Sequence, residues 1–289
     1  MMFSYAEMTR RNIGFVTVAE QARLKDATVF VCGTGGMGGA CLLALARIGV
    51  GHLIIADIDE FEVSNLNRQV FAFAETIDRH KAEATRDILL RINPELQITV
   101  WRDDWPEHVT EAVAQAAVVV NGTDDLGASL LLYRTARAAG KSVIDAYASP
   151  LPSIYVTAPT DTPHEVRLGY PTVGTAWDKL TEDQRSEAFM REAEHVMIHS
   201  SSRHYIDLDL VAEVVSGTRS RMSFAPMVIT TGQLMAYEVV NAVLGRKRGA
   251  DNRGWFFNPH AGRVERPKPA WLAAIMRMIV RRFMARMLA

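Results

Sequence analysis

The chain has 289 residues, of which 48% are hydrophobic and 22% charged, and its formal net charge is −1. This composition excludes a disordered chain and suits one large α/β domain, alone or with a small annex. The near-neutral balance excludes a strong overall attraction to nucleic acid or membranes. The first residues lack the basic and apolar regions of a secretory signal, and the apolar runs are interrupted below membrane-spanning length. We therefore expect a cytoplasmic protein.

An N-terminal helical arm (1–27) precedes the core, which opens with a buried strand over 29–32. The strand leads into the turn GTGGMG at 33–38 and then into a helix over 37–48. A strand, a glycine turn and a helix in this order form a phosphate-binding unit, because the helix N-terminus offers unpaired N–H groups and a positive dipole.

The glycines of this turn, Gly33, Gly35, Gly36 and Gly38, occupy positions where a side chain would interfere. They let the backbone turn sharply, approach a phosphate closely and pack the helix against the strand. The sequence therefore predicts a nucleotide site here.

A second strand, 52–57, ends in Asp57-Ile58-Asp59. Asp57 falls where a ribose-binding carboxylate belongs, although the same residue could simply cap the loop. Asp59 could orient the loop, contact the ligand or assist a metal. Taken alone, these residues favour a nicotinamide or flavin dehydrogenase.

The polar string EVSNLNRQ at 62–69 argues for a different ligand, together with Lys81 at the start of a helix over about 80–92. A dehydrogenase needs only the ribose carboxylate at this place. An enzyme that handles a triphosphate needs cations and amide donors around its phosphates. Arg68 and Lys81 can supply the cations.

Strands and helices continue to alternate up to residue 145, which implies a mostly parallel sheet covered on both faces. Such sheets bind ligands beyond the carboxyl ends of their strands. Thr123-Asp124-Asp125 follows the apolar strand 117–120, so its carboxylates should emerge at that edge. The remaining predicted elements are a strand at 96–101, a helix at 106–115, a helix at 127–139 and a strand at 142–145.

The pattern changes after Asp145 to a proline-interrupted stretch that predicts antiparallel strands near 150–159. We divide the chain into the arm 1–27, an ATP-binding core 28–160, a crossover insert 160–222, the end of the core 223–265 and a basic tail 266–289. The insert contains a charged helix near 181–198; a long helix over 226–245 and a last strand at 254–258 complete the core.

These motifs closely resemble the ThiF/MoeB/HesA family, the bacterial relatives of ubiquitin-activating enzymes. The shared pattern is Gly-x-Gly-Gly-x-Gly, Asp-x-Asp, Ser-Asn-Leu-x-Arg-Gln, a lysine and Thr-Asp-Asp, in this order. The resemblance covers residues 10–160 strongly and 222–260 more weakly. It implies a Rossmann-like, doubly wound sheet with antiparallel C-terminal strands and a crossover insert above the active site.

The resemblance also implies a MgATP site. Asn65, Arg68 and Gln69 would face the β- and γ-phosphates and Lys81 the α-phosphate, while Asp124 would coordinate Mg²⁺. Asp125 stands where sulfur-carrier relatives have asparagine, and its role stays open. Arg11 resembles an arginine that reaches the partner's γ-phosphate across a homodimer.

Only two cysteines are present, Cys32 and Cys41, and both fall in predicted core elements. Two Cys-x-x-Cys pairs are absent, so no structural zinc is expected, and no cysteine in the insert can form a thioester with a carrier. The histidines of the second half are scattered, and we expect ordinary packed or solvated side chains rather than metal ligands. They are His164, His195, His199 and His204.

The tail 268–289 has no acidic residue and shows a helical apolar repeat with arginines beside it. It could lie on an anionic membrane, bind a partner or pack against its own dimer. The predicted apolar stripe is Leu272, Met276, Ile279, Phe283 and Met287, with Arg277 and Arg281 opposite and Arg282 and Arg286 at one edge.

The expected activity is an adenylyltransferase that activates a carboxylate as an acyl-adenylate, on a peptide or small carrier-protein C-terminus or, less favoured, on tRNA. Without an insert cysteine, the adenylate would pass directly to a nucleophile, or to a thiol supplied elsewhere. The alternatives are a nucleotide-binding scaffold without catalysis and a nicotinamide-dependent oxidoreductase.

Overall fold

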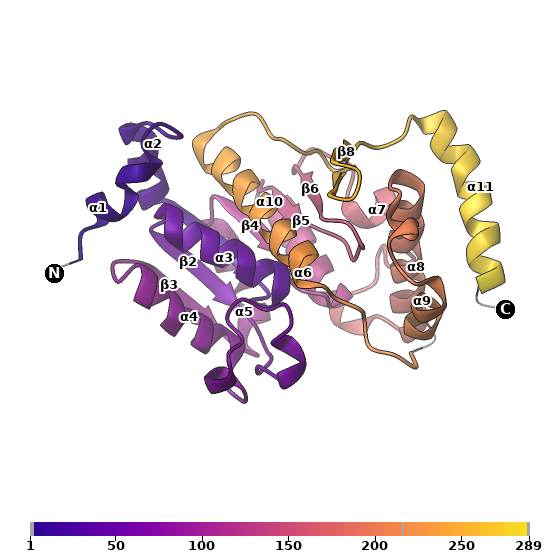
Figure 1. Cartoon of the computed structure of the whole chain (residues 1–289), viewed down its shortest axis with the longest axis horizontal. Helices are drawn as coiled ribbons and strands as arrows, with labels where there is room; N and C mark the ends of the chain where they lie inside the picture. Colours follow the sequence, from indigo (N-terminus) through magenta and orange to yellow (C-terminus); the bar gives the residue numbers. More distant parts are fainter. Residues whose placement is uncertain (1–2, 216, 288–289) are drawn as a thin grey trace.

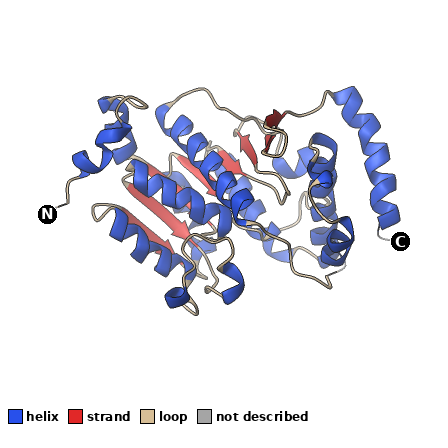
Figure 2. Cartoon of the chain, viewed as in Figure 1, coloured by secondary structure: helices blue, strands red, loops and turns tan. Residues whose placement is uncertain are grey.

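The computed structural model describes residues 3–215 and 217–287, except for the side chains of residues 215, 286 and 287. Eight strands form one sheet in the order β3-β2-β1-β4-β5-β6-β7-β8 (Figure 2). Strands β1 to β5 pair in parallel. Strand β6 pairs antiparallel with β5, β7 with β6, and β8 with β7. Their bounds are β1 Thr28–Cys32, β2 His52–Ala56, β3 Gln97–Trp101, β4 Val118–Asn121, β5 Val143–Asp145, β6 Ser153–Thr157, β7 Trp255–Asn258 and β8 Arg263–Glu265.

Helices cover both faces of the sheet because the strand residues alternate between two apolar clusters. Val29 and Val31 of β1 point to α3 (Gly36–Ile48), α4 (Lys81–Ile92) and α10 (Ala225–Leu244). Phe30 and Cys32 point to α5 (Trp105–Gln115) and α6 (Leu126–Ala138). Successive strand side chains face opposite sides of a sheet, so an almost continuous apolar run serves both layers. The predicted doubly wound fold with antiparallel C-terminal strands is confirmed.

The other helices form the arm, the insert and the tail (Figure 1). α1 and α2 belong to the arm, α7, α8 and α9 to the insert, and α11 to the tail. Their bounds are α1 Tyr5–Thr9, α2 Val18–Asp26, α7 His164–Leu168, α8 Glu182–His199, α9 Leu208–Val215 and α11 Ala270–Met287, with short 3-10 turns that include η1 Arg10–Asn12, η2 Val63–Asn65 and η5 Ser202–His204.

Two details of the predicted layout were wrong. The strand at 254–258 is not the last, because β8 pairs with β7 at the edge of the sheet. The insert has α7 and α9 besides the expected α8. These elements have three, five and eight residues, and segments this short carry little periodic signal.

Helix α10 is long and apolar enough, by length and composition alone, to cross a membrane, with a mean hydropathy of 1.3. Thr231, Gln233 and Glu238 interrupt its apolar residues, so it does not contradict the expectation that no uninterrupted apolar run reaches that length. In the fold, α10 packs against α3 and the sheet through Met235, Ala236 and Val239, so its apolar face belongs to the core.

Helix α11 packs on α8 of its own chain (Figure 1). Ala273, Val280 and Met284 are buried there with Ile198 of α8, and Met276 and Phe283 lie beside them. The predicted stripe is therefore wrong in part: Ile279 is exposed, and the side chain of Met287 lies outside the described residues.

The arginines of α11 also differ from the expectation that they lie away from the apolar face. Nε of Arg277 and Nε of Arg281 contact the two carboxyl oxygens of buried Glu194 on α8, at 3.0 and 2.8 Å. One glutamate on the neighbouring helix thus turns both arginines toward the packed side, which a pattern within the tail alone could not indicate.

Close backbone packing within the glycine turn leaves no room for a side chain at Gly38. A Cβ on Gly38 would overlap the carbonyl oxygen of Gly33, which is fixed backbone. We expect Gly38→Ala to lower the free energy of unfolding by at least about 3 kcal/mol, the upper range for overpacking. Gly140→Ala is the control, because its φ of 68° is positive but nothing lies within 4 Å of the added atom; it should cost only about 1–2 kcal/mol. Urea unfolding measures both, and equal losses would contradict the steric argument.

Candidate functional site

The glycine turn between β1 and α3 lies directly against the loop that follows β4. Gly33 has a φ of 90°, and a Cβ on it would lie 2.6 Å from the backbone nitrogen of Thr123. The N–H of Gly122 donates to the carbonyl oxygen of Cys32 at 2.7 Å. This close approach brings the segment Thr123–Asp125 to the N-terminus of α3, as parallel strand order requires.

The turn is tied to the end of β2 through Asp57. The backbone N–H and Oγ1 of buried Thr34 donate to Oδ2 of Asp57 at 2.7 and 3.0 Å, and Oδ1 accepts from the N–H of Asp59 at 3.0 Å. Asp57 therefore caps the loop, one of the two roles predicted for it. It remains partly exposed, and a carboxylate has further acceptor sites for a ligand.

Lys81 is anchored to the same loop. Its Nζ lies 2.8 Å from Oδ2 of Asp59, and its N–H donates to the carbonyl oxygen of Asp59 at 2.8 Å. The Lys81 side chain is only 10% exposed, whereas that of Asp59 is 61% exposed. A largely buried ammonium group is thus held at the start of α4 by a partner that can turn toward solvent.

The segment 65–69 lies against the glycine turn. The Gln69 amide carbon is 3.7 Å from the position of a Cβ on Gly35, and Cγ of Arg68 is 4.0 Å from one on Gly36. The Arg68 guanidinium donates to the carbonyl oxygen of Ser64 and to Oδ1 of Asn67, both at 2.9 Å. Among residues 3–215 and 217–287 it has no carboxylate partner, so its charge is available to a ligand.

Asn65 and Gln69 differ in how far the fold satisfies their amides. Oδ1 of buried Asn65 accepts from the N–H of Glu62 at 3.1 Å and thereby caps the turn η2. Oε1 of Gln69 is buried and has no hydrogen-bond partner in the described part of the chain. A buried polar atom without a partner is costly, so Gln69 is the better candidate for a ligand contact.

The two aspartates after β4 have different surroundings. The Asp124 side chain is 87% exposed and faces NH1 of Arg221 at 3.7 Å. Asp125 accepts from the N–H of Ala128 at 2.7 Å as the N-cap of α6, and it forms an ion pair with Arg185 at 2.7 Å. Asp125 thus has a structural role, whereas Asp124 remains open to a cation.

The end of the insert and the start of α10 close over these segments. Besides Arg221, which faces Asp124, Ser223 accepts a hydrogen bond from Asn67 at 3.2 Å, and Val228 lies against Gly36. Segments that are far apart in the sequence therefore meet around the N-terminus of α3.

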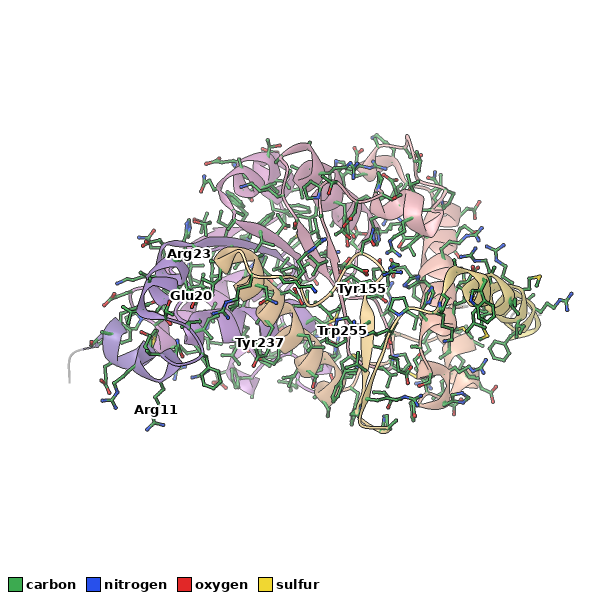
Figure 3. All side chains as sticks on the ribbon, turned by 90° about the horizontal axis from the view of Figure 1, so that it is seen from above. Arg11, Glu20, Arg23, Tyr155, Tyr237 and Trp255 are labelled. Carbon is green, nitrogen blue, oxygen red and sulfur yellow. The ribbon has the colours of Figure 1, made fainter. Side chains whose placement is uncertain are left out.

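Arg11 lies away from this site within the same chain. It projects from η1 at the edge of the molecule (Figure 3) and has no ion pair among the residues described. Its neighbour Asn12 donates to the carbonyl oxygen of Ile48 at the far end of α3. Gly36 and Ile48 are twelve positions apart in α3, which corresponds to about 18 Å, more than an arginine side chain reaches.

Neither cysteine offers a reactive thiol at this site. Cys32 and Cys41 are buried, and burial raises the pKa of both thiols well above the usual range. A thiol that does not ionise is neither a nucleophile nor a zinc ligand.

The histidines do not converge on a metal site. Residues 3–215 and 217–287 contain no group of three or more histidine, cysteine, aspartate or glutamate side chains that could hold a metal ion. Burial lowers the pKa of His195 to about 2 and of His199 to about 4, and these two rings contact each other at a centroid distance of 4.5 Å. His164 packs among tyrosines, and His204 is exposed on η5.

A buried polar cluster beside the site was missed in the sequence. Oη of Tyr133 donates to Oδ2 of Asp145 at 2.8 Å, and Tyr170 donates to Glu192 of α8. Burial raises the pKa of Asp145 to about 6 and that of Glu192 to about 7. Asp145 ends the last parallel strand, a position that could have indicated it. Nothing in the sequence indicates Glu192, because the insert brings it there.

Comparisons with known proteins agree with this geometry. The ThiF family matches residues 9–270. The chain is 39% identical over 107 residues to the sulfur carrier protein ThiS adenylyltransferase of Escherichia coli K12, and 41% identical over 109 residues to the molybdopterin-synthase adenylyltransferase of Salmonella typhimurium LT2. Each match covers 37% of this chain and 43% of the relative, so the chain spans less than half the length of either.

Solved structures share the fold over most of the chain. PaaA superposes with a TM-score of 0.63 at 19% identity, covering 92% of this chain and 86% of PaaA. E. coli MccB with AMPCPP and MccA gives 0.63 at 18% identity, covering 91% of this chain and 72% of MccB. Because the family match spans nearly the whole sequence and includes the glycine turn and the segments around it, the chain belongs to the ThiF family.

Proposed function

We propose that this protein is a MgATP-dependent adenylyltransferase that activates a carboxyl group. The observation that carries the proposal is the set of contacts around the glycine turn, which touches the loops carrying Arg68 and Asp124 and connects through Asp57 and Asp59 to Lys81. Relatives named adenylyltransferases support it. A dinucleotide does not require two cations and an exposed carboxylate in this arrangement.

The residues that would hold ATP follow from their surroundings. The N–H groups of the glycine turn and of the start of α3 would donate hydrogen bonds to phosphate oxygens of ATP. Arg68 and Lys81 would neutralise the charge of the phosphates. Asp57 would accept hydrogen bonds from the ribose, with Asp59 keeping Lys81 in place. Asn65 would keep η2 in the conformation that presents Arg68, and the unpartnered amide of Gln69 would contact the ligand directly.

Asp124 would hold the magnesium ion. Mg²⁺ is bound by one or two carboxylates together with phosphate oxygens and water, and it requires oxygen ligands that solvent can reach. The exposed carboxylate of Asp124 meets that requirement, with Arg221 as its replaceable partner at 3.7 Å. Magnesium would supply charge neutralisation on the phosphates.

The reaction is the attack of a carboxylate oxygen of the substrate on the α-phosphorus of ATP, which forms an acyl-adenylate and releases pyrophosphate. The protein contributes positioning and charge stabilisation rather than a covalent intermediate. Because both cysteines are buried, the adenylate would pass directly to a nucleophile of the acceptor, with a thiol from another protein as the second route.

The substrate we favour is the C-terminus of a peptide or small carrier protein, with a tRNA-bound carboxylate less favoured. MccB, which shares the fold, was solved with MccA, and one relative is named for the sulfur carrier protein ThiS. A nucleotide-binding scaffold without catalysis is the alternative.

Substitutions of the three charged groups test the activity. We expect Arg68→Ala, Lys81→Met and Asp124→Asn each to lower ATP–pyrophosphate exchange by about 100- to 1000-fold, the usual loss when one charge-stabilising contact is removed. Arg91→Ala is the matched control, because Arg91 is exposed and has no ion pair in the described part of α4; its rate should stay unchanged. If the wild-type chain shows no ATP–pyrophosphate exchange with any peptide although ATP raises its Tm, a nucleotide-binding scaffold without catalysis is favoured. If NADH rather than ATP raises the Tm, an oxidoreductase is favoured.

We also propose that the protein works as a homodimer in which Arg11 completes the partner's site. Arg11 cannot reach the glycine turn of its own chain, and it projects outward at the edge of the molecule (Figure 3). The same arm exposes the apolar side chains of Phe15 (85% exposed) and Val18 (73% exposed). Exposed apolar side chains of this size are available for contact with a second copy of the chain.

Mixing two inactive variants tests the arrangement. Arg11→Ala and Lys81→Met should each be inactive alone. A mixed dimer contains one site with Lys81 intact and Arg11 supplied by the partner, so statistical exchange of subunits should restore about a quarter of the wild-type rate. Subunit exchange is verified by mass measurement. If the activity does not recover after verified exchange, catalysis in trans is ruled out.

The outer face of α11 supports contact with an anionic membrane. Trp271, Ile275, Met278 and Ile279 are exposed at helical spacing, and Arg282 lies beside them on a segment without acidic residues. Apolar and basic side chains together favour an anionic bilayer surface.

We expect Trp271→Glu with Met278→Glu to abolish sedimentation with vesicles that contain phosphatidylserine, because two charges enter the apolar face without disturbing the contact with α8. Ala114→Glu with Ala138→Glu, exposed on α5 and α6, is the control for two added charges away from α11. If the wild-type protein stays in the supernatant with these vesicles, binding to an anionic membrane is excluded.

A further inference from the structure

A basic pocket lies at the C-terminal end of α8. It has a volume of about 410 Å³ and is bounded by the last turn of α8, by η5 and by β8 with the segment that follows it. Such a volume is within the range of ligand sites in proteins. Its charged lining residues are Arg203, Arg263, Arg266 and Lys268, with Glu265 as the acid.

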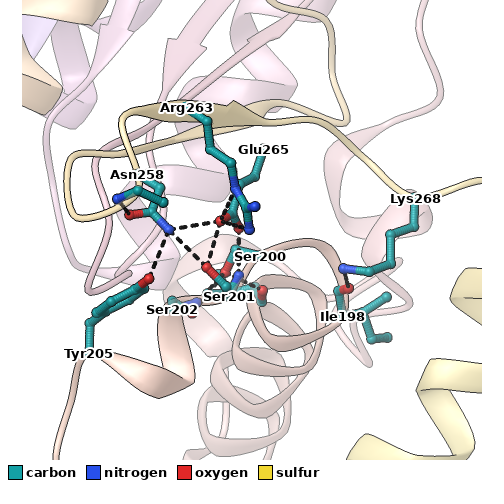
Figure 4. A network of polar contacts seen from close by, with 11 residues as sticks. Ile198, Ser200, Ser201, Ser202, Tyr205, Asn258, Arg263, Glu265 and Lys268 are labelled. Atoms are coloured by element: carbon teal, nitrogen blue, oxygen red, sulfur yellow. Dashed lines mark hydrogen bonds and ion pairs between the residues drawn. The ribbon is translucent and has the colours of Figure 1, made fainter.

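Glu265 is already satisfied by neighbouring donors (Figure 4). It accepts from the N–H of Ser201 at 2.6 Å, from Nδ2 of Asn258 at 2.8 Å and from the Arg263 guanidinium at 3.2 Å. Burial opposes its ionisation, but these hydrogen bonds outweigh burial and lower its pKa to about 2. Glu265 therefore organises the wall of the pocket, and it neutralises Arg263 rather than the other cations.

Two arginines of the pocket remain without a counter-ion. Lys268 donates from Nζ to the carbonyl oxygen of Ile198 at 2.6 Å, at the negative end of the α8 dipole (Figure 4). Arg203 and Arg266 have no ion pair with any residue from 3 to 215 or from 217 to 287. The pocket thus has two positive charges that are unmatched by the fold.

The chemistry of the lining favours an acidic peptide over a bare inorganic anion. Guanidinium groups bind carboxylates through paired hydrogen bonds, and two separate arginines suit two acidic side chains. Met197, Val264 and Met276 line the same pocket and would contact the methylene groups of glutamate.

Helix α8 connects this pocket to the candidate catalytic edge. Arg185, near the start of α8, forms an ion pair with Asp125, next to Asp124, whereas His199 at the end lines the pocket. Arg185 and His199 are fourteen positions apart, which corresponds to about 21 Å of helix. An extended peptide covers this distance with about six residues.

We infer that the pocket of Arg203 and Arg266 binds acidic residues of the peptide substrate, about six positions before the carboxylate that is activated. This inference rests on the proposed function, since it identifies the class of peptide and the position of its recognition element.

Binding of a labelled peptide to the full chain, without nucleotide, tests the pocket directly. Fluorescein-labelled tetraglutamate should give saturable anisotropy that weakens with salt, and labelled tetraglutamine should give none. Arg203→Ala with Arg266→Ala should weaken tetraglutamate binding by about tenfold or more, because two charge-assisted contacts are lost. Arg47→Ala with Arg91→Ala removes the same charge from exposed positions outside the pocket and should leave binding unchanged.

Three outcomes would overturn the inference: no saturable binding of tetraglutamate, equal weakening in both double variants, or binding of inorganic phosphate without tetraglutamate. Since this assay needs no ATP, it separates the pocket from catalysis. Exchange assays then test the spacing. With the wild-type chain, a peptide with glutamates six residues before its C-terminus should have a KM about tenfold lower than the same peptide with glutamines. With the variant that lacks Arg203 and Arg266, the two peptides should have the same KM. Exchange that does not distinguish the two peptides would reject the spacing while leaving the proposed adenylation intact.

Discussion

The close backbone contact between the glycine turn and the loop after β4 is the constraint on which the site depends. Gly33 and Gly38 leave no room for a Cβ, and Gly122 packs into the same space. This contact fixes where the N-terminus of α3 meets the end of β4. Asp57 and Lys81 are then attached through hydrogen bonds to the turn and to Asp59. A side chain at Gly33 or Gly38 would separate the helix dipole from the charged groups around it.

The insert has both structural and functional consequences. Its arginines neutralise the aspartates after β4, Arg221 at Asp124 and Arg185 at Asp125, and so attach residues 160–222 to the edge of the sheet. The insert also provides α8, which carries Glu192 near the site and supports α11 along its length. An insertion can thus add new surface to a conserved core without changing its glycine turn.

Charge is distributed unevenly although the chain is almost neutral overall. Glu194 holds two arginines of α11, and Glu265 is satisfied by Ser201 and Asn258. Arg68 at the glycine turn and Arg203 and Arg266 beyond α8 keep no carboxylate partner within the described ranges. The fold thus leaves cations unpaired at two separate places, where they are available to anionic groups of ligands.

The sequence by itself determined the sheet, the glycine turn and the family, because these follow from local signals. Apolar strands, Gly33–Gly38 and the polar string 62–69 are read within a few residues. Only the tertiary structure decided that Asp125 pairs with Arg185, that Arg277 and Arg281 turn back to Glu194, and that Arg203 and Arg266 share a pocket. These relations join residues up to nearly ninety positions apart through long polar side chains, and such side chains have no period in the sequence that indicates which partner they meet.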